Sequence, residues 1–136
     1  MILLDASVVT KLINSQEEKS DIAAKLLLAH IQGRERIIVP SLLFLEVANA
    51  LATKSLLKEE HIKKGLHLLY EASFIIHEVT EKNLIEASLL ARKYNTSVYD
   101  MIYAVIAKER QTNLVTSDKK FADKTNFPFI KILSSY

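Results

Sequence analysis

The chain has 136 residues, 49% of them hydrophobic, and its charged side chains leave a net charge of +2. This size suits one ordinary hydrophobic core, so we expect a single domain over residues 1–136. Cysteine is absent, which excludes disulfides, thiol nucleophiles and thiolate zinc sites, and two glycines are too few for a glycine-rich phosphate loop. Because no apolar run approaches the roughly 18 to 20 residues that span a bilayer, and the N-terminus lacks a secretory signal pattern, we expect a soluble, cytoplasmic protein.

Short apolar runs alternate along the chain with longer segments of helical periodicity. In chain order, the patterns predict a strand at Ile2–Leu4, helices at Ala6–Asn14 and Glu18–Gln32, a strand at Ile37–Val39, helices at Ser41–Thr53 and Lys58–Tyr70, a strand at Phe74–His77, helices at Glu81–Tyr94 and Val98–Arg110, and strands at Leu114–Thr116 and Phe129–Leu133. This alternation predicts an α/β domain with a mostly parallel sheet.

Two polar residues mark helix starts within this pattern. Thr80 and Ser97 are each placed to cap the helix that follows them. Asn83 stands in the third helical position after Thr80, where a full capping box would have Glu. Ligands of parallel sheets bind at the carboxyl ends of the strands, so polar residues at those ends are the first candidates for a site.

Acidic side chains in apolar surroundings are the most informative feature of the sequence. Most of the 16 Asp and Glu residues have polar neighbours and fit a solvated helix face. Asp5 and Asp118 differ because each follows a predicted strand directly. A helix N-cap role explains either residue equally well when it is considered alone.

The other two acids lie within helices that are otherwise apolar. Glu46 shares a helical face with Leu43 and Val47, where a carboxylate is costly unless a cation or several donors satisfy it. Asp100 lies in the first turn of its predicted helix, with Tyr103 on the same side. The helix dipole alone gives a simple account of Asp100.

Convergence of Asp5, Glu46, Asp100 and Asp118 would bring four negative charges together, and a cation would have to offset their repulsion. Hard divalent ions such as Mg²⁺ and Mn²⁺ prefer carboxylate and water oxygens and need neither Cys nor His. The four histidines, by contrast, have no metal-binding spacing and are expected on the surface or in ordinary packing; they are His30, His61, His67 and His77. An acidic metal site of this kind suits phosphoryl chemistry.

Four sequence motifs carry a resemblance to a known family. They are D-A-S at Asp5–Ser7, P-S-L-L-F-L-E-V-A-N-A-L at Pro40–Leu51, S-V-Y-D-M-I-Y-A-V-I-A at Ser97–Ala107 and L-V-T-S-D-K-K-F at Leu114–Phe121. In order and spacing, the chain resembles a PIN domain, and most closely a VapC-type toxin ribonuclease. The motifs cover nearly the whole chain, and the set is far more specific than any single member.

The resemblance implies a three-layer α/β/α sandwich around a parallel sheet of about five strands. It implies Mg²⁺- or Mn²⁺-dependent cleavage of RNA that leaves a 5′-phosphate, with Asp5, Glu46, Asp100 and Asp118 as the catalytic and metal-binding acids. Ser7, Asn49 and Thr116 fall on supporting positions, whereas Asp123 fits either an outer helper or a surface acid. The family also implies a homodimer and, in toxin members, a small antitoxin for which we expect a groove at Leu42–Leu57 and the following helix.

Basic and aromatic side chains could contact RNA. Lys119 and Lys120 adjoin Asp118 and are the best candidates, and weaker candidates are Lys11, Lys54 and Arg110. Tyr99 and Tyr103 could stack on bases, although their helical spacing is more typical of core residues.

Other functions remain open on the sequence. A phosphoacceptor receiver would have paired acids after the first strand, and an aspartyl phosphatase would have D-x-D, whereas Asp5–Ser7 offers one acid. A catalytically silent RNA-binding or signalling module, or a PIN nuclease that processes RNA rather than acting as a toxin, is also compatible with the pattern.

Overall fold

The computed structural model describes all residues from Met1 to Tyr136. Five strands form one parallel sheet in the order β3-β2-β1-β4-β5, with every neighbouring pair parallel. The strands are β1 (Ile2–Leu4), β2 (Ile37–Pro40), β3 (Ile75–His77), β4 (Asn113–Thr116) and β5 (Ile130–Ile132). The predicted α/β sandwich with five strands is confirmed, and the sheet is wholly rather than mostly parallel.

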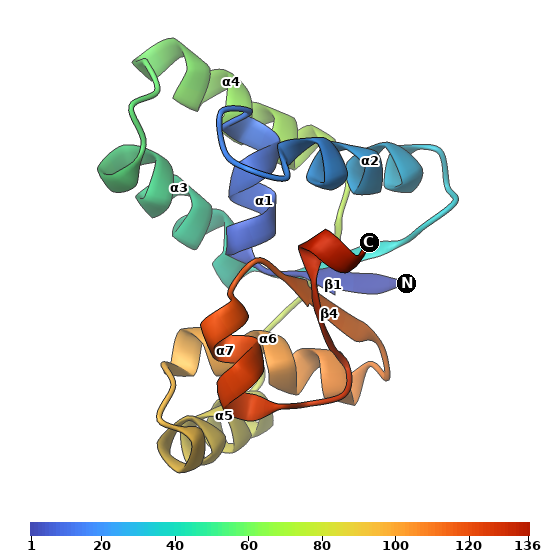
Figure 1. The fold of residues 1–136 in the computed structure, drawn as a ribbon, viewed down its shortest axis with the longest axis vertical. Coiled ribbons are helices and arrows are strands. Elements are labelled where there is room, and N and C mark those ends of the chain that lie inside the picture. The colour runs from blue at the N-terminus through green and yellow to red at the C-terminus, as the bar shows by residue number, and fades with distance from the viewer.

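Seven α-helices cover the two faces of this sheet (Figure 1). They are α1 (Ala6–Ile13), α2 (Ser20–Ile31), α3 (Leu42–Lys54), α4 (Glu59–Glu71), α5 (Glu81–Tyr94), α6 (Val98–Glu109) and α7 (Lys119–Thr125), and a 3₁₀ turn, η1 (Leu133–Ser135), follows β5. Helices α1 to α4 lie on one side of the sheet and α5 to α7 on the other. None of the helices has the length and apolar character needed to cross a membrane.

The centre of the sheet fixes where the strand ends meet. Strand β1 pairs with β2 on one side and β4 on the other, and Leu3 and Leu4 are fully buried. Leu4 pairs with Val115, so the carboxyl ends of β1 and β4 lie side by side. Asp5, which follows β1, and Thr116, the last residue of β4, therefore share one edge of the sheet.

Element boundaries differ from the predictions by one or two residues at several places. Helix α2 begins at Ser20 rather than Glu18 because Lys19 adopts a left-handed backbone conformation with φ 64°. Pro40, which lies between the predicted strand Ile37–Val39 and the helix predicted from Ser41, is the last residue of β2 and pairs with His77. The last strand ends at Ile132 because Leu133 opens the 3₁₀ turn.

The Thr80 cap forms a complete capping box although its third residue is Asn. Thr80 Oγ1 accepts a hydrogen bond from the Asn83 backbone N–H, and Asn83 Oδ1 accepts one from the Thr80 backbone N–H. A Glu at this position was therefore not required. The shorter Asn side chain closes the box and is itself buried, with 1% of its surface exposed.

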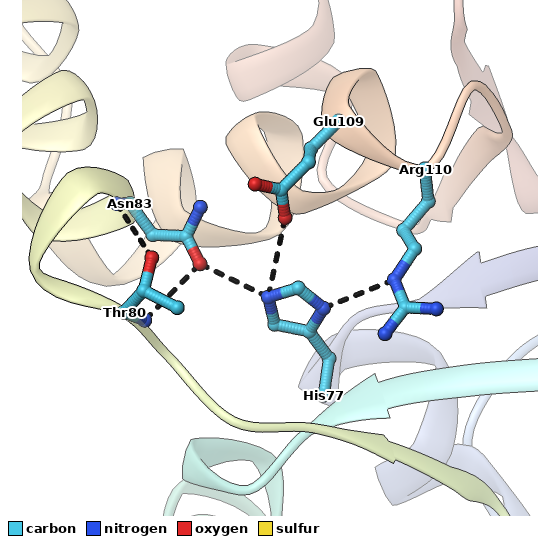
Figure 2. Close-up of polar contacts among 5 residues, drawn as sticks. All are labelled: His77, Thr80, Asn83, Glu109 and Arg110. Carbon is cyan, nitrogen blue, oxygen red and sulfur yellow. Dashed lines mark hydrogen bonds and ion pairs between the residues drawn. The ribbon is translucent and has the colours of Figure 1, made fainter.

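A buried histidine links this cap to the end of α6 (Figure 2). His77 Nε2 lies 2.9 Å from Asn83 Oδ1, and Arg110 Nε donates to His77 Nδ1 over 3.1 Å. Because Nδ1 accepts, the ring carries its proton on Nε2 and donates it to Asn83. The Glu109 carboxylate lies 3.5 Å from Nε2. We call these four residues, together with Thr80, the His77 cluster. It holds β3, α5 and the end of α6 together, and it contains Arg110, which was considered as an RNA contact.

Candidate active site

Asp5 connects the end of β1 to the start of α1. Its Oδ1 caps α1 by accepting a hydrogen bond from the Val8 backbone N–H over 3.2 Å. The same oxygen accepts one from Ser7 Oγ at 2.6 Å, and Oδ2 accepts one from Thr116 Oγ1 at 2.5 Å. Asp5 is therefore both a helix cap and a fixed carboxylate whose two oxygens are oriented by hydroxyl groups.

Hydroxyl groups also join the end of β4 to that of β1. Ser7 Oγ accepts a hydrogen bond from the Ser117 backbone N–H, and Thr116 Oγ1 accepts one from the Asp118 backbone N–H. Asp118 caps α7, because its Oδ1 accepts a hydrogen bond from the Phe121 backbone N–H over 3.0 Å. Two carboxylates from distant parts of the chain are thus held at neighbouring strand ends.

Helices α3 and α6 contribute the other two acids. The Glu46 carboxylate is half-buried, and its Oε1 accepts a hydrogen bond from the Tyr103 hydroxyl over 2.9 Å. Tyr103 itself is only 2% exposed, so this contact joins the two helices across the site. Asp100 lies in the first turn of α6, where the Ser97 hydroxyl caps the helix by accepting from the Asp100 backbone N–H.

All four acids line one cavity of about 250 Å³, which we call the carboxylate pocket. Its other lining residues are Ala6, Ser7, Thr10, Asn49, Ala50, Lys54 and Tyr103. The structure thus brings together every acid singled out in the sequence, with Ser7 and Asn49 beside them. Thr116 supports the pocket from behind, through its hydrogen bond to Asp5.

Three of the carboxylates, those of Asp5, Glu46 and Asp100, have raised pKa values. Burial raises the pKa of Asp5 to about 6, the hydrogen bonds from Ser7 and Thr116 oppose this shift, and the charge of Asp100 adds to it. Burial also raises the pKa of Glu46 and that of Asp100. Glu46 feels the charges of Asp100 and Asp5, and Asp100 feels that of Asp118. A cation in the pocket would offset both the desolvation cost of the buried carboxylates and the repulsion between them.

The donor chemistry of the pocket fits a hard divalent cation bound partly through water. No group of three or more acidic or histidine side chains is arranged to hold an ion directly. Mg²⁺ commonly keeps several waters and takes only one or two carboxylates from the protein. Four carboxylates around a cavity of about 250 Å³ leave room for such waters.

The basic and aromatic candidates are arranged differently from the sequence-based ranking. Lys54 lines the carboxylate pocket, whereas Lys119 is exposed and forms an ion pair with Asp123 over 2.7 Å. Lys120 lines a neighbouring cavity that includes Asp100 and Asp118. Nothing in the sequence ranks Lys54 first among the RNA contacts, because it lies eight residues after Glu46. Only the path of α3 shows that Lys54 reaches the same pocket.

The two tyrosines of α6 also separate. Tyr99 is 61% exposed, so the expectation that it packs in the core is wrong. Tyr103 is a core residue, as its helical spacing indicated, but its hydroxyl also reaches Glu46. In the sequence, the only indication of this contact with Glu46 was the position of Tyr103 one helical turn after Asp100.

Comparison with known proteins agrees with this geometry. The family model described as PIN domain matches residues 2–126. The chain belongs to the PIN-domain family. It is 30% identical over 128 residues to Ribonuclease VapC3 of Pyrobaculum aerophilum, covering 90% of this chain and 93% of that protein, which places this PIN domain with the VapC type.

Solved structures of other PIN-domain proteins share the fold. The Mycobacterium tuberculosis toxin VapC20, described as cleaving the sarcin–ricin loop, has a TM-score of 0.73 at 12% identity and covers 95% of this chain and 96% of its own. A toxin–antitoxin complex from Klebsiella pneumoniae has a TM-score of 0.71 at 15% identity, with 98% of both chains covered. At these identities the likeness concerns the PIN fold alone.

Proposed function

We propose that this PIN domain is a metal-dependent endoribonuclease and the toxin of a toxin–antitoxin pair. The convergence of Asp5, Glu46, Asp100 and Asp118 in one pocket carries the proposal. Ser7 and Thr116 already hydrogen-bond to Asp5, and the chain has no cysteine, so no activated nucleophile competes with the carboxylates. The name of the relative Ribonuclease VapC3 supports RNA as the substrate.

Asp5, Asp100 and Asp118 would hold Mg²⁺ or Mn²⁺, directly or through water, and Glu46 would complete the set. The bound ion lowers the pKa of water and neutralises charge that develops on the phosphate. Ser7 and Thr116 keep both Asp5 oxygens oriented, and the Tyr103 hydroxyl holds one Glu46 oxygen. The other oxygen of Glu46 is left to position the attacking water.

Positive charge beside the pocket would bind the RNA backbone. Lys54 lines the carboxylate pocket and Lys120 lines the neighbouring cavity, so each can reach a phosphate next to the site. We retain Lys119 as a weaker contact because it can leave its exposed pair with Asp123 at little cost. The supporting amide of Asn49 lies in the same pocket and can donate to a substrate oxygen.

A small antitoxin and a second copy of the chain are the proposed partners. The stretch Leu42–Leu57 and helix α4 expose large apolar side chains, with Leu45 71% exposed and Tyr70 68% exposed. Tyr70 stacks on Phe44 with ring centroids 4.6 Å apart, which joins α3 and α4 into one apolar surface. The toxin–antitoxin complex among the structural neighbours supports this assembly. Co-purification with a small partner, and the mass of the isolated chain in solution, test the two assemblies.

The decisive experiment compares RNA cleavage by wild type, Asp5→Asn and Asp118→Asn with Mg²⁺, with Mn²⁺ and with a chelator. Asparagine preserves a helix-capping oxygen while it removes the charge, so both variants should fold and lose at least about a hundredfold in cleavage rate. Asp21→Asn, at an exposed acid of α2, is the control and should cleave like wild type. Full activity of Asp5→Asn, or cleavage that persists in chelator, contradicts the proposal.

Metal binding has a separate readout that does not depend on catalysis. Because four acids repel one another in the metal-free protein, millimolar Mg²⁺ or Mn²⁺ should raise the melting temperature of wild type more than that of Asp5→Asn. An unchanged melting temperature contradicts the metal site. RNA binding without cleavage, together with no metal effect, would favour the catalytically silent module, whereas metal-dependent cleavage without any antitoxin partner would favour RNA processing.

A further inference from the structure

A second cavity adjoins the carboxylate pocket and has a different chemical character. This side cavity has a volume of about 350 Å³ and shares Ser7, Thr10, Ala50, Lys54 and Asp118 with the pocket. Its own lining residues are Lys11, Asn14, Glu17, Ser55 and Ser117. A ligand that spans both cavities would therefore place one part beside the acids and the next part beside Lys11 and Glu17.

Two residues that line the side cavity each carry a buried side-chain oxygen atom that has no hydrogen-bond partner. These atoms are Glu17 Oε2 and Ser117 Oγ, and no other buried side-chain polar atom of the protein is unpaired. Each such atom carries a desolvation cost that a suitable donor would recover. A carboxylate oxygen accepts and cannot donate, so Glu17 calls for a ligand with N–H or O–H groups.

Two lysines supply positive charge on the same walls. Lys11 projects from α1 and Lys54 from the end of α3, and neither forms an ion pair with any acid of the chain. The cavity therefore combines unpaired acceptors with unpaired cations. Its volume is near the lower end of the range for small-ligand sites, about 300 to 1,000 Å³, which suits one nucleotide-sized group.

We propose that the side cavity binds the nucleotide that flanks the scissile phosphate and that Glu17 selects guanine at this position. The edge of guanine presents two adjacent donors, N1–H and the N2 amino group, next to the acceptor O6. Glu17 and Ser117 accept from the donors, and Lys11 donates to O6, a contact that lysine commonly makes with guanine. Lys54, which lines both cavities, neutralises the intervening phosphate. The inference rests on the proposed ribonuclease function and adds its base preference.

Binding tests this inference independently of cleavage. Short uridine oligomers with a single G, A, C or inosine are titrated, by fluorescence anisotropy with Mg²⁺, into full-length Asp5→Asn protein and into the same protein carrying Glu17→Gln. The G oligomer should bind about tenfold more tightly than all-U RNA, and inosine, which lacks the N2 amino group, should lose part of that gain. Glu17→Gln should reduce the G preference to about twofold or less. Glu18→Gln, at the adjacent exposed acid, is the matched control and should keep it.

Lys11→Ala tests the cationic part of the site. This substitution should weaken binding of the G oligomer more than binding of all-U RNA, and it should lower the salt dependence of binding. Lys25→Ala, at an exposed position of α2, should change neither quantity. Equal binding of all oligomers, or a G preference that survives Glu17→Gln, overturns the inference. These results can be distinguished from failure of the proposed function. If the wild-type protein shows no metal-dependent cleavage, the nuclease function is rejected. If it cleaves RNA without a base preference at the flanking nucleotide, only the role of Glu17 is rejected.

Discussion

The carboxylate pocket and the His77 cluster are both polar groups set into apolar surroundings, but they are built in opposite ways. In the His77 cluster each ring nitrogen has a partner, and the charged neighbours, Arg110 and Glu109, have opposite signs. In the carboxylate pocket, four acids lie together with one lysine, Lys54, and burial raises the pKa of Asp5 and that of Glu46. The first arrangement stabilises the fold by itself, whereas the second leaves a repulsion between carboxylates that a bound cation would relieve.

The largest expected effect is on catalysis, and it is confined to the carboxylate pocket. Glu46→Gln keeps the shape of the side chain and an oxygen for the Tyr103 hydroxyl but removes the charge, so kcat/KM for RNA cleavage should fall at least about a hundredfold. The metal-free variant should be at least as stable as wild type, because a repelled carboxylate is gone. Cleavage assays and urea denaturation in chelator check both parts. Glu60→Gln, at an exposed acid of α4, is the control.

The next effect concerns the pH dependence of stability in the metal-free protein. The pKa of Asp5 rises from 3.8 to about 6 on folding, so the folded state favours the protonated form. Its contribution is present in full below about pH 4 and is lost as pH rises through 6, a change of about 3 kcal/mol in the free energy of unfolding. The difference between wild type and Asp5→Asn in urea denaturation, measured from pH 4 to pH 8 in chelator, isolates this group. A difference that is constant with pH contradicts the burial of Asp5 as a carboxylate.

Removing the side chain at the centre of the His77 cluster should lower stability and leave catalysis nearly unchanged. His77→Ala leaves the buried Asn83 amide and the Arg110 guanidinium without their ring partner and should lower the free energy of unfolding by about 2 kcal/mol. The kcat of the folded fraction should change less than twofold, because the His77 cluster shares no residue with the carboxylate pocket. His61→Ala, on the exposed surface of α4, is the control. A fall in kcat that exceeds the loss of folded protein would show that the two regions are coupled.

The sequence predicted the carboxylate pocket better than it predicted the His77 cluster, for a physical reason. Glu46 among apolar neighbours, and Asp5 after a buried strand, conflict with local preferences and so stand out. Capping and metal binding are alternatives for Asp5 when the sequence is considered alone, yet one of its oxygens caps α1 and the residue also lines the pocket. His77 and Arg110 conflict with nothing locally, and their contact joins residues 33 apart in the chain, which no periodicity reports.

The fold was predictable because strand and helix alternate with clear periodicity, whereas side-chain contacts depend on tertiary geometry. Lys119 and Lys120 were the best candidates for RNA contact because they adjoin Asp118, but Lys119, as part of α7, lies one turn from Asp123 and pairs with it. Lys54 reaches the carboxylate pocket only because α3 leads from Glu46 along its wall. Adjacency in sequence therefore identified Lys120, which lies beside Asp100 and Asp118, but missed Lys54, which lines the carboxylate pocket itself.

The smallest expected effect lies at the contact between the core and the carboxylate pocket. The Tyr103 hydroxyl donates to Glu46 and lowers the pKa of that carboxyl against the effect of burial. Tyr103→Phe removes this bond, so the pKa of Glu46 should rise and the acid limb of the pH–rate profile should move to higher pH. The free energy of unfolding should fall by about 1 kcal/mol, the usual value of one such hydrogen bond. Tyr99→Phe, at the exposed tyrosine of the same helix, should leave the profile unchanged. If Tyr103→Phe lowers stability and leaves the acid limb in place, the Tyr103 hydroxyl stabilises the fold only, as the contacts of the His77 cluster do. In that case the ionisation of Glu46 does not limit cleavage.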